Sequence, residues 1–171
     1  MSDSRARCPA PVVTGADRGG VNIRHPADAR GYPIELASLA GVRAAAVSDG
    51  RRYGLPDGRL NDLVLVANEL ATNAVRHGGG SGRMWLWCSD GHVYCQVVDE
   101  GSGMSDPDHA GEKPTDRNAL TGRGLWLIRQ MAERIDIDTG LGGTTVTVSI
   151  ALLSGHATSN STAPDGLVAD C

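Results

Sequence analysis

The stretch RMWLWCSDGHVYCQVVDE, residues 83–100, decides the fold of this chain. Two runs of alternating apolar and polar residues flank Asp90-Gly91, a strong signal for a two-residue hairpin turn. A loop at these two residues pairs Met84 with Val97, Leu86 with Cys95, and Cys88 with Val93. These six residues form one apolar face, and Trp85, Trp87, Tyr94 and Gln96 form the other. We therefore expect a β-hairpin whose apolar face is covered by other elements.

Helical segments precede this hairpin. Residues 34–53 are Ala-rich and carry apolar residues at helical spacing, and Gly54-Leu55-Pro56 ends the pattern. A second helix is predicted over residues 57–77, with an apolar stripe that includes Leu63, Val66 and Leu70. The glycines at 78–80 stop it. Before both helices, VNIRHPA at residues 21–27 fits a short first strand.

After the hairpin, residues 101–121 form a polar loop, and so long a loop is usually functional. A helix is predicted from residue 124 to 135, and strands at 135–140 and 144–153 are joined by a Gly-rich turn. Tightly joined strands are antiparallel, so helices can cover one face. We predict an α+β fold, a two-layer sandwich with a mixed, mostly antiparallel sheet and helices on one face.

Composition narrows the function. The chain has 171 residues and a net charge of −4, which suits one domain and argues against direct nucleic-acid binding. The four cysteines show no CxxC spacing, and there is neither an apolar run for a membrane helix nor a signal peptide. We expect a cytoplasmic protein with an N-terminal arm at 1–20, an ordered domain at 21–153 and a polar tail at 154–171.

Polar groups interrupt the border of the apolar stripe in the helix over residues 57–77. Glu69 and Asn73 are four residues apart and stack on one face, and His77 follows one turn later. They are expected to be half-buried and aimed across the sheet. The alternative is an ordinary amphipathic border. If they form a site, Asn73 can give an oxygen to Mg²⁺, which takes few protein ligands.

The strand end VVDEGSGM, residues 97–104, brings Asp99 to a bend made by Gly101 and Gly103. Asp99 can accept a hydrogen bond from an exocyclic amine, and the glycines allow positive φ or close approach of a ligand. The alternative is a plain turn.

Two glycine-rich junctions follow. In LTGRGLWLI, residues 120–128, Gly122 and Gly124 precede a helix whose free N–H groups can bind an anion. The alternative is a simple helix entry. In GLGGTTVTVSI, residues 140–150, Thr144 opens the last strand and can offer its hydroxyl to a base edge or a water. The alternative is a hairpin turn.

Together these motifs resemble the N, G1, G2 and G3 boxes of the GHKL ATP-binding superfamily: ELATNAVRHG, DEGSGM, GRGL and GGTTVTV in order. The resemblance covers about residues 21–150 and implies the Bergerat fold with ATP and Mg²⁺. It implies Glu69 as general base, Asn73 as Mg²⁺ ligand and Asp99 as the partner of the adenine amine. It further assigns the following residues to the nucleotide: Gly101, Gly103, Gly122, Gly124, Leu125 and Thr144. Residues 104–121 would be the ATP lid.

Some roles stay open within this resemblance. Arg123 or Arg117 would neutralise the γ-phosphate, and His77 either contacts phosphate or caps the helix end.

The small size and the leading segment ASLAGVRAAAV are similar to the anti-sigma factor serine/threonine kinases of bacteria. That resemblance implies a sigma factor and an anti-anti-sigma antagonist as protein partners, with phosphorylation of a serine on the antagonist. The alternative is a nucleotide-dependent regulatory binding protein without kinase activity.

The second face of the hairpin carries Trp85, Trp87 and Tyr94. If it is open, the aromatic cluster suggests an interface, for instance of a homodimer. The alternative is that another segment of the chain packs over it.

Overall fold

Residues 23–107, 109–112 and 123–152 are described by the structure, a computed structural model of the chain. The predicted arm at 1–20 and the predicted tail at 154–171 lie outside these residues. The domain boundaries therefore stay a prediction.

One sheet of five strands runs in the order β1-β2-β3-β5-β4. The strands are β1, Arg30–Glu35; β2, Ser81–Ser89; β3, His92–Asp99; β4, Arg134–Gly140; and β5, Gly143–Ala151. Every neighbouring pair in the described part of the chain is antiparallel, so the predicted mixed sheet is wrong in that detail. Strands β3 and β4 run in the same direction, but β5 lies between them, and no parallel pair forms.

The central hairpin is confirmed in its register. Met84 pairs with Val97, Leu86 with Cys95 and Cys88 with Val93, around the turn at Asp90 and Gly91. Both turn residues have positive φ, 44° and 73°, as the tight hairpin turn requires. The apolar face of this hairpin lies in the core.

The start of the domain differs from the sequence-based expectation. Strand β1 is Arg30–Glu35 rather than residues 21–27, and Ile34 lies in it instead of in a helix. Ile34 is buried on the core side of β1, which pairs with β2. A 3-10 turn, Leu36–Ser38, and helix α1, Leu39–Tyr53, follow. Pairing with β2 decides where the first strand ends and the first helix begins. The spacing of apolar residues in the sequence does not show this pairing.

Helix α2, Asp57–His77, has the predicted bounds, and its last turn closes with the backbone N–H of Gly78 donating to the Ala74 carbonyl at 2.9 Å. Helix α3 is described over Arg123–Met131 and ends earlier than the predicted residue 135. Ile135 pairs with Val148 as part of β4 instead. An apolar residue in a short segment fits a helix or a strand, and the sheet register decides between them.

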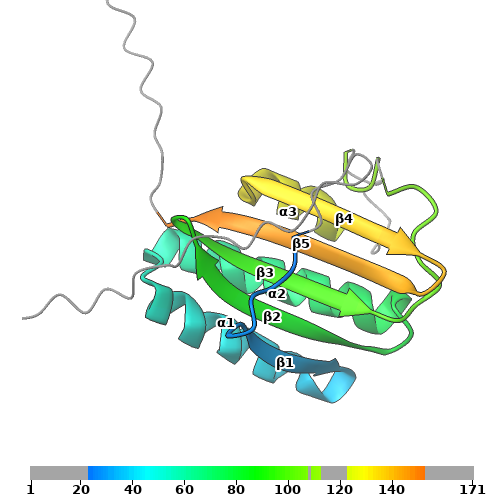
Figure 1. Cartoon of the computed structure of the whole chain (residues 1–171), viewed down its shortest axis with the longest axis horizontal. Helices are drawn as coiled ribbons and strands as arrows, with labels where there is room; N and C mark the ends of the chain where they lie inside the picture. Colours follow the sequence, from blue (N-terminus) through cyan, green and yellow to red (C-terminus); the bar gives the residue numbers. More distant parts are fainter. Residues whose placement is uncertain (1–22, 108, 113–122, 153–171) are drawn as a thin grey trace, which may run out of the picture.

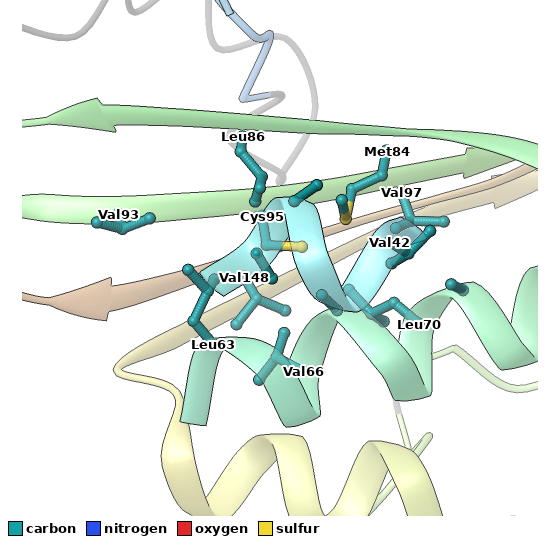
Figure 2. Packing of buried hydrophobic residues seen from close by; sticks show 14 of the residues in the cluster. Val42, Leu63, Val66, Leu70, Met84, Leu86, Val93, Cys95, Val97 and Val148 are labelled. Carbon is teal, nitrogen blue, oxygen red and sulfur yellow. The ribbon is translucent and has the colours of Figure 1, made fainter. Parts of the chain in front are cut away.

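All three helices lie on one face of the sheet, as predicted (Figure 1). Strands β2, β3 and β5 send alternate side chains toward α1 and α2 (Figure 2). Leu63 and Val66 of α2 are fully buried in this layer, as are Met84 and Val148 of the sheet. The α+β two-layer sandwich is therefore confirmed.

The opposite face of the sheet is partly covered by residues 23–29, which cross it (Figure 1). The His25 ring stacks on Trp85 with centroids 4.4 Å apart and meets Trp87 edge-on at 6.5 Å. Trp87 is 5% exposed. Of the two interpretations of this aromatic face, the one with a covering segment is correct, so this face does not offer an open aromatic surface for a homodimer.

A buried glutamine fixes the covering segment. The Gln96 amide nitrogen donates to the carbonyl of Ile23 at 2.7 Å and to Oγ1 of Thr147 at 2.9 Å. Gln96 is 4% exposed, and its bond to Thr147 is buried, whereas its bond to Ile23 is partly buried. Residues 23–29 are therefore anchored to the sheet by a satisfied polar contact as well as by ring stacking.

A buried carboxylate joins α1 to β1. Asp49 is fully buried and accepts hydrogen bonds from the Tyr32 hydroxyl at 2.6 Å and from the Arg30 guanidinium at 2.8 Å. Burial of the Tyr32 ring and its bond to Asp49 raise the pKa of Tyr32 to about 12. The contact stabilises the edge strand on the first helix.

Candidate functional site

A pocket of about 260 Å³ opens between α2, α3 and the ends of β3 and β5. Its lining is made of Leu70, Asn73, Ala74, His77, Val97, Asp99, Gly103, Met104, Gly124, Leu125, Thr144 and Val146. The volume is near the lower end of small-molecule sites, about 300 to 1,000 Å³. An apolar interior with a few polar groups at its edge suits a flat, partly polar ligand.

Asp99 is the last residue of β3 and stands at the edge of the pocket. Its Oδ1 accepts the backbone N–H of Gly101 at 3.0 Å and that of Thr144 at 3.2 Å. Within the described residues no hydrogen bond is recorded for Oδ2, which is therefore available to a ligand. Two backbone donors fix the carboxylate before any ligand arrives.

The glycines around Asp99 are required by close contacts. A Cβ on Gly101 would lie 2.7 Å from the Cα of Gly78 and 2.8 Å from the carbonyl oxygen of His77. Gly103 has φ +81°, and a Cβ there would overlap the carbonyl oxygen of Gly140. Gly103 lines the pocket, whereas Gly101 is not among its lining residues. Close backbone packing requires glycine at both positions, whether the bend serves a ligand or is a plain turn.

Helix α2 contributes three of the predicted polar residues. Asn73 and His77 line the pocket, Asn73 half-buried and His77 exposed. Glu69 is half-buried one turn earlier and is not among the lining residues. Its Oε2 would lie 2.6 Å from a Cβ on Gly124. Glu69 therefore sits against the first turn of α3, at the border of the pocket.

The start of α3 differs slightly from the expectation. Gly124 lies within the helix, which is described from Arg123, and does not precede it. Gly124 and Leu125 line the pocket, while Arg123 is exposed and outside the lining. Gly122 and Arg117 fall outside the described residues. Gly124 allows α3 to approach Glu69, since any side chain there would displace the carboxylate.

Thr144 is the second residue of β5 and lines the pocket beside Asp99. The sequence did not point to Thr139, whose Oγ1 lies 3.0 Å from that of Thr144. It also did not single out Val146 as part of a site. Val146 is two residues beyond Thr144 on the same strand face, so strand alternation is a signal that could have found it.

Several apolar lining residues were predicted only as core. Leu70 and Ala74 extend the apolar stripe of α2, and Val97 belongs to the inner face of β3. These side chains line the pocket together with Gly124 and Leu125 of α3. The same stripe that fills the core therefore also supplies the pocket floor.

The described residues contain no group of three or more His, Cys, Asp or Glu side chains that could hold a metal ion by themselves. Asn73 supplies one amide oxygen at the pocket. This donor set fits Mg²⁺ delivered with a nucleotide, since that ion keeps waters and phosphate oxygens as most of its ligands. It does not fit a metal held by protein side chains alone.

The fold and the pocket define a class of protein: a two-layer α+β sandwich with a pocket between its helices and the ends of its strands. The chain belongs to the histidine kinase-like ATPase domain family, whose model matches residues 32–150. This confirms the resemblance to the GHKL superfamily, and membership implies ATP as the ligand.

Solved structures share this fold. The chain is similar to the RsbU and RsbW domains of Rv1364c from Mycobacterium tuberculosis, with 21% identity and a TM-score of 0.55 over 75% of this chain. It is also similar to the histidine kinase domain of a blue-light activated histidine kinase from Erythrobacter litoralis EL346, with 23% identity and a TM-score of 0.46 over 68% of this chain. The matched regions are 33% and 60% of those two chains.

No curated protein matches the sequence. Among the described helices, none has the length and apolar character of a bilayer-spanning segment.

Proposed function

We propose that this domain binds ATP with Mg²⁺ and acts as a protein serine/threonine kinase and anti-sigma factor. It would bind a sigma factor and phosphorylate a serine of an anti-anti-sigma antagonist. The main support for a nucleotide site is the carboxylate of Asp99, which two backbone hydrogen bonds hold at the edge of an apolar pocket. The RsbW domain named in the M. tuberculosis structure supports the anti-sigma type as a fold-level analogy.

At the base end, Asp99 accepts a hydrogen bond from the exocyclic amine of adenine through Oδ2, because Oδ1 is already bonded to two backbone donors. Leu70, Val97 and Met104 offer apolar surface for the ring. Guanine presents a carbonyl in place of the amine, and its oxygen would face the carboxylate. The pocket therefore favours adenine by charge as well as by shape.

At the phosphate end, Gly124, Leu125 and Gly122 would present backbone N–H groups at the start of α3, where the helix dipole favours an anion. The amide oxygen of Asn73 would hold Mg²⁺. The bound ion would neutralise charge on the phosphate oxygens. His77 and Arg123 stand as further candidates to contact phosphate, with Arg117 as the alternative to Arg123.

The kinase step is assigned to Glu69. Its carboxylate would accept the proton of the substrate serine hydroxyl as that oxygen attacks the γ-phosphorus, with ADP as the leaving group. Glu69 is one helical turn from Asn73, so the base and the metal ligand are on one side of the phosphate. Gly124 keeps space for the carboxylate at that border.

Calorimetry of ATP binding with Mg²⁺ tests the site. We expect Asp99→Asn and Asn73→Ala each to weaken binding by about tenfold or more, which corresponds to about 1.4 kcal/mol. Asn61→Ala is the matched control, since Asn61 is an exposed residue of the same helix, far from the pocket. If the wild-type protein does not bind ATP at millimolar concentration, the proposed function is wrong.

A second candidate function is a nucleotide-dependent regulatory binding protein without kinase activity. The position of Glu69 favours it, because the carboxylate lies against Gly124 and outside the pocket lining. In this alternative ATP binding alone would regulate the partner. All base-binding and metal-binding residues would keep their roles.

Phosphotransfer separates the two functions. The protein is incubated with labelled ATP and an antagonist of the sulphate-transporter/anti-sigma-antagonist type, and label on the antagonist is measured. The kinase proposal expects transfer by the wild type and by Glu133→Gln, a surface carboxylate, and loss of transfer by Glu69→Gln with ATP binding kept. Absence of label with intact ATP binding favours the binding protein.

A further inference from the structure

A chain of polar side chains links helix α1 to Glu69. The guanidinium of Arg43 in α1 donates to Oδ1 of Asn68 at 3.0 Å, and the amide nitrogen of Asn68 lies 3.4 Å from Oε1 of Glu69. Helix α2, which carries Asn68 and Glu69, contacts both α1 and α3. Neither Arg43 nor Asn68 lines the pocket, and neither has a role in the function proposed above.

The direction of both hydrogen bonds follows from the groups themselves. A guanidinium group has donors only, so the atom of Asn68 that faces Arg43 is the amide oxygen. The amide nitrogen is then the atom that faces Glu69. An ionised carboxylate has acceptors only, so the nitrogen donates to it. Arg43 therefore decides which end of the Asn68 amide meets the carboxylate.

The two carboxylate oxygens of Glu69 have different surroundings. Oε1 is the oxygen that accepts from Asn68. Oε2 is the oxygen nearer to Gly124, since it lies 2.6 Å from the position of a Cβ there. Gly124 lines the pocket in the first turn of α3, where the phosphates would bind. The bond from Asn68 therefore occupies one oxygen and leaves the other on the side of α3 and the pocket.

We propose that Arg43 and Asn68 are positioning residues for the general base: they hold the carboxylate of Glu69 so that Oε2 accepts the proton of the substrate serine. The inference rests on the kinase step proposed above. Arg43 is exposed and Asn68 is half-buried, and the bond to Glu69 is longer than the common N–H···O distance of about 2.7 to 3.2 Å. The contribution to the rate is therefore moderate.

A double-mutant cycle on phosphotransfer tests the proposal. Rates are measured at saturating ATP over a range of antagonist concentrations, which separates kcat from KM, for the wild type, Arg43→Glu, Asn68→Ala and the double variant. In Arg43→Glu the new carboxylate only accepts, so it draws the amide nitrogen of Asn68 toward itself and turns the amide oxygen toward Glu69. Arg43→Lys keeps a donor and is the conservative variant. Arg51→Glu, at an exposed arginine of the same helix, is the matched control.

We expect Asn68→Ala and Arg43→Glu each to lower kcat about fivefold to tenfold, the loss of one hydrogen bond to a charged acceptor, with ATP affinity within about twofold of the wild type. In the Asn68→Ala protein, Arg43→Glu should have no further effect on kcat, because Arg43 acts through Asn68. Arg43→Lys and Arg51→Glu should behave as the wild type. A contact of Arg43 with the antagonist would change KM instead, and a purely structural role would lower stability in urea.

NMR adds a readout that needs no activity. The side-chain amide signals of Asn68 should move in Glu69→Gln and in Arg43→Glu, and they should stay in place in Arg51→Glu. Unchanged signals in Glu69→Gln would overturn the proposal, as would a kcat of Asn68→Ala within about twofold of the wild type. Additive effects of Arg43→Glu and Asn68→Ala on kcat would also overturn it. A wild type that binds ATP but transfers no phosphate would contradict the proposed kinase step itself, and this inference with it.

Discussion

The carboxylate of Asp99 accepts the backbone N–H of Thr144 at 3.2 Å, between residues 45 positions apart in the chain. The same oxygen accepts the N–H of Gly101. One side chain therefore holds the loop after β3 and the start of β5 at a single point of the pocket edge. Substitutions that disturb this point should affect stability and ligand binding together.

Gly143→Ala should be strongly destabilising. Gly143 has φ +123°, and a Cβ there would overlap the carbonyl of Asp99. Neither group is the end of a flexible side chain, so the backbone must move, and we expect a loss of about 3 kcal/mol or more. Gly142→Ala, with open space around it, should change stability by less than about 0.5 kcal/mol. Urea unfolding measures the stability of both variants. Equal stabilities of Gly143→Ala and Gly142→Ala would mean that a Cβ at residue 143 causes no backbone strain.

Gly124→Ala should separate catalysis from stability. The new Cβ would meet Oε2 of Glu69 at 2.6 Å, and that carboxylate can rotate away. We expect the free energy of unfolding to change by less than about 1 kcal/mol and phosphotransfer to fall on the order of tenfold to a hundredfold, since Glu69 is displaced. Gly58→Ala in the open first turn of α2 is the control. Unchanged phosphotransfer by Gly124→Ala would argue against Glu69 as the base.

Tyr32→Phe should weaken the contact between β1 and α1. It removes the 2.6 Å hydrogen bond to the buried carboxylate of Asp49, and we expect a loss of about 1 to 2 kcal/mol in chemical unfolding. Tyr94→Phe is the control: Tyr94 stacks on Trp87, and its change should be below about 0.5 kcal/mol. Equal effects of the two substitutions would mean that the bond to Asp49 contributes little.

Stability should also fall in strong alkali. The pKa of Tyr32 is raised from 10.0 to about 12, chiefly by burial and then by Asp49. The folded state therefore favours the neutral phenol, and this stabilisation is complete below pH 10 and is lost as the pH rises to 12. Burial raises the pKa of Tyr53 and Tyr94 too. Tyr32→Phe should accordingly lose less stability than the wild type across this range. If the stability of Tyr32→Phe and that of the wild type fall in parallel between pH 10 and 12, Tyr32 is not the group responsible.

His25→Ala should loosen the cover over the outer face of the sheet. The His25 ring stacks on Trp85 with an interplanar angle of 12°, and we expect a loss of about 0.5 to 1.5 kcal/mol. Acrylamide should then quench tryptophan fluorescence more strongly. His109→Ala, at an exposed position, is the control. Unchanged quenching would mean that the stack does not protect the tryptophan.

Much of the site could be predicted because its residues belong to short, local patterns. Glu69, Asn73 and His77 recur at helical spacing, and Asp99 and Thr144 stand beside glycines at strand ends. Such patterns depend on neighbours in the sequence. Thr139 and the packing of Gly124 against Glu69 could not be predicted, because they arise where strands and helices distant in sequence meet.

The sequence by itself determined the hairpin register, helix α2 and the α+β class, because alternation and helical period are local consequences of burying one face. Only the tertiary structure decided that Ile34 and Ile135 lie in strands and that residues 23–29 cover the aromatic face. These outcomes depend on hydrogen bonds and ring contacts across tens of residues. An apolar residue has the same reason to be buried in a helix or in a strand, and only the partner strand distinguishes the two.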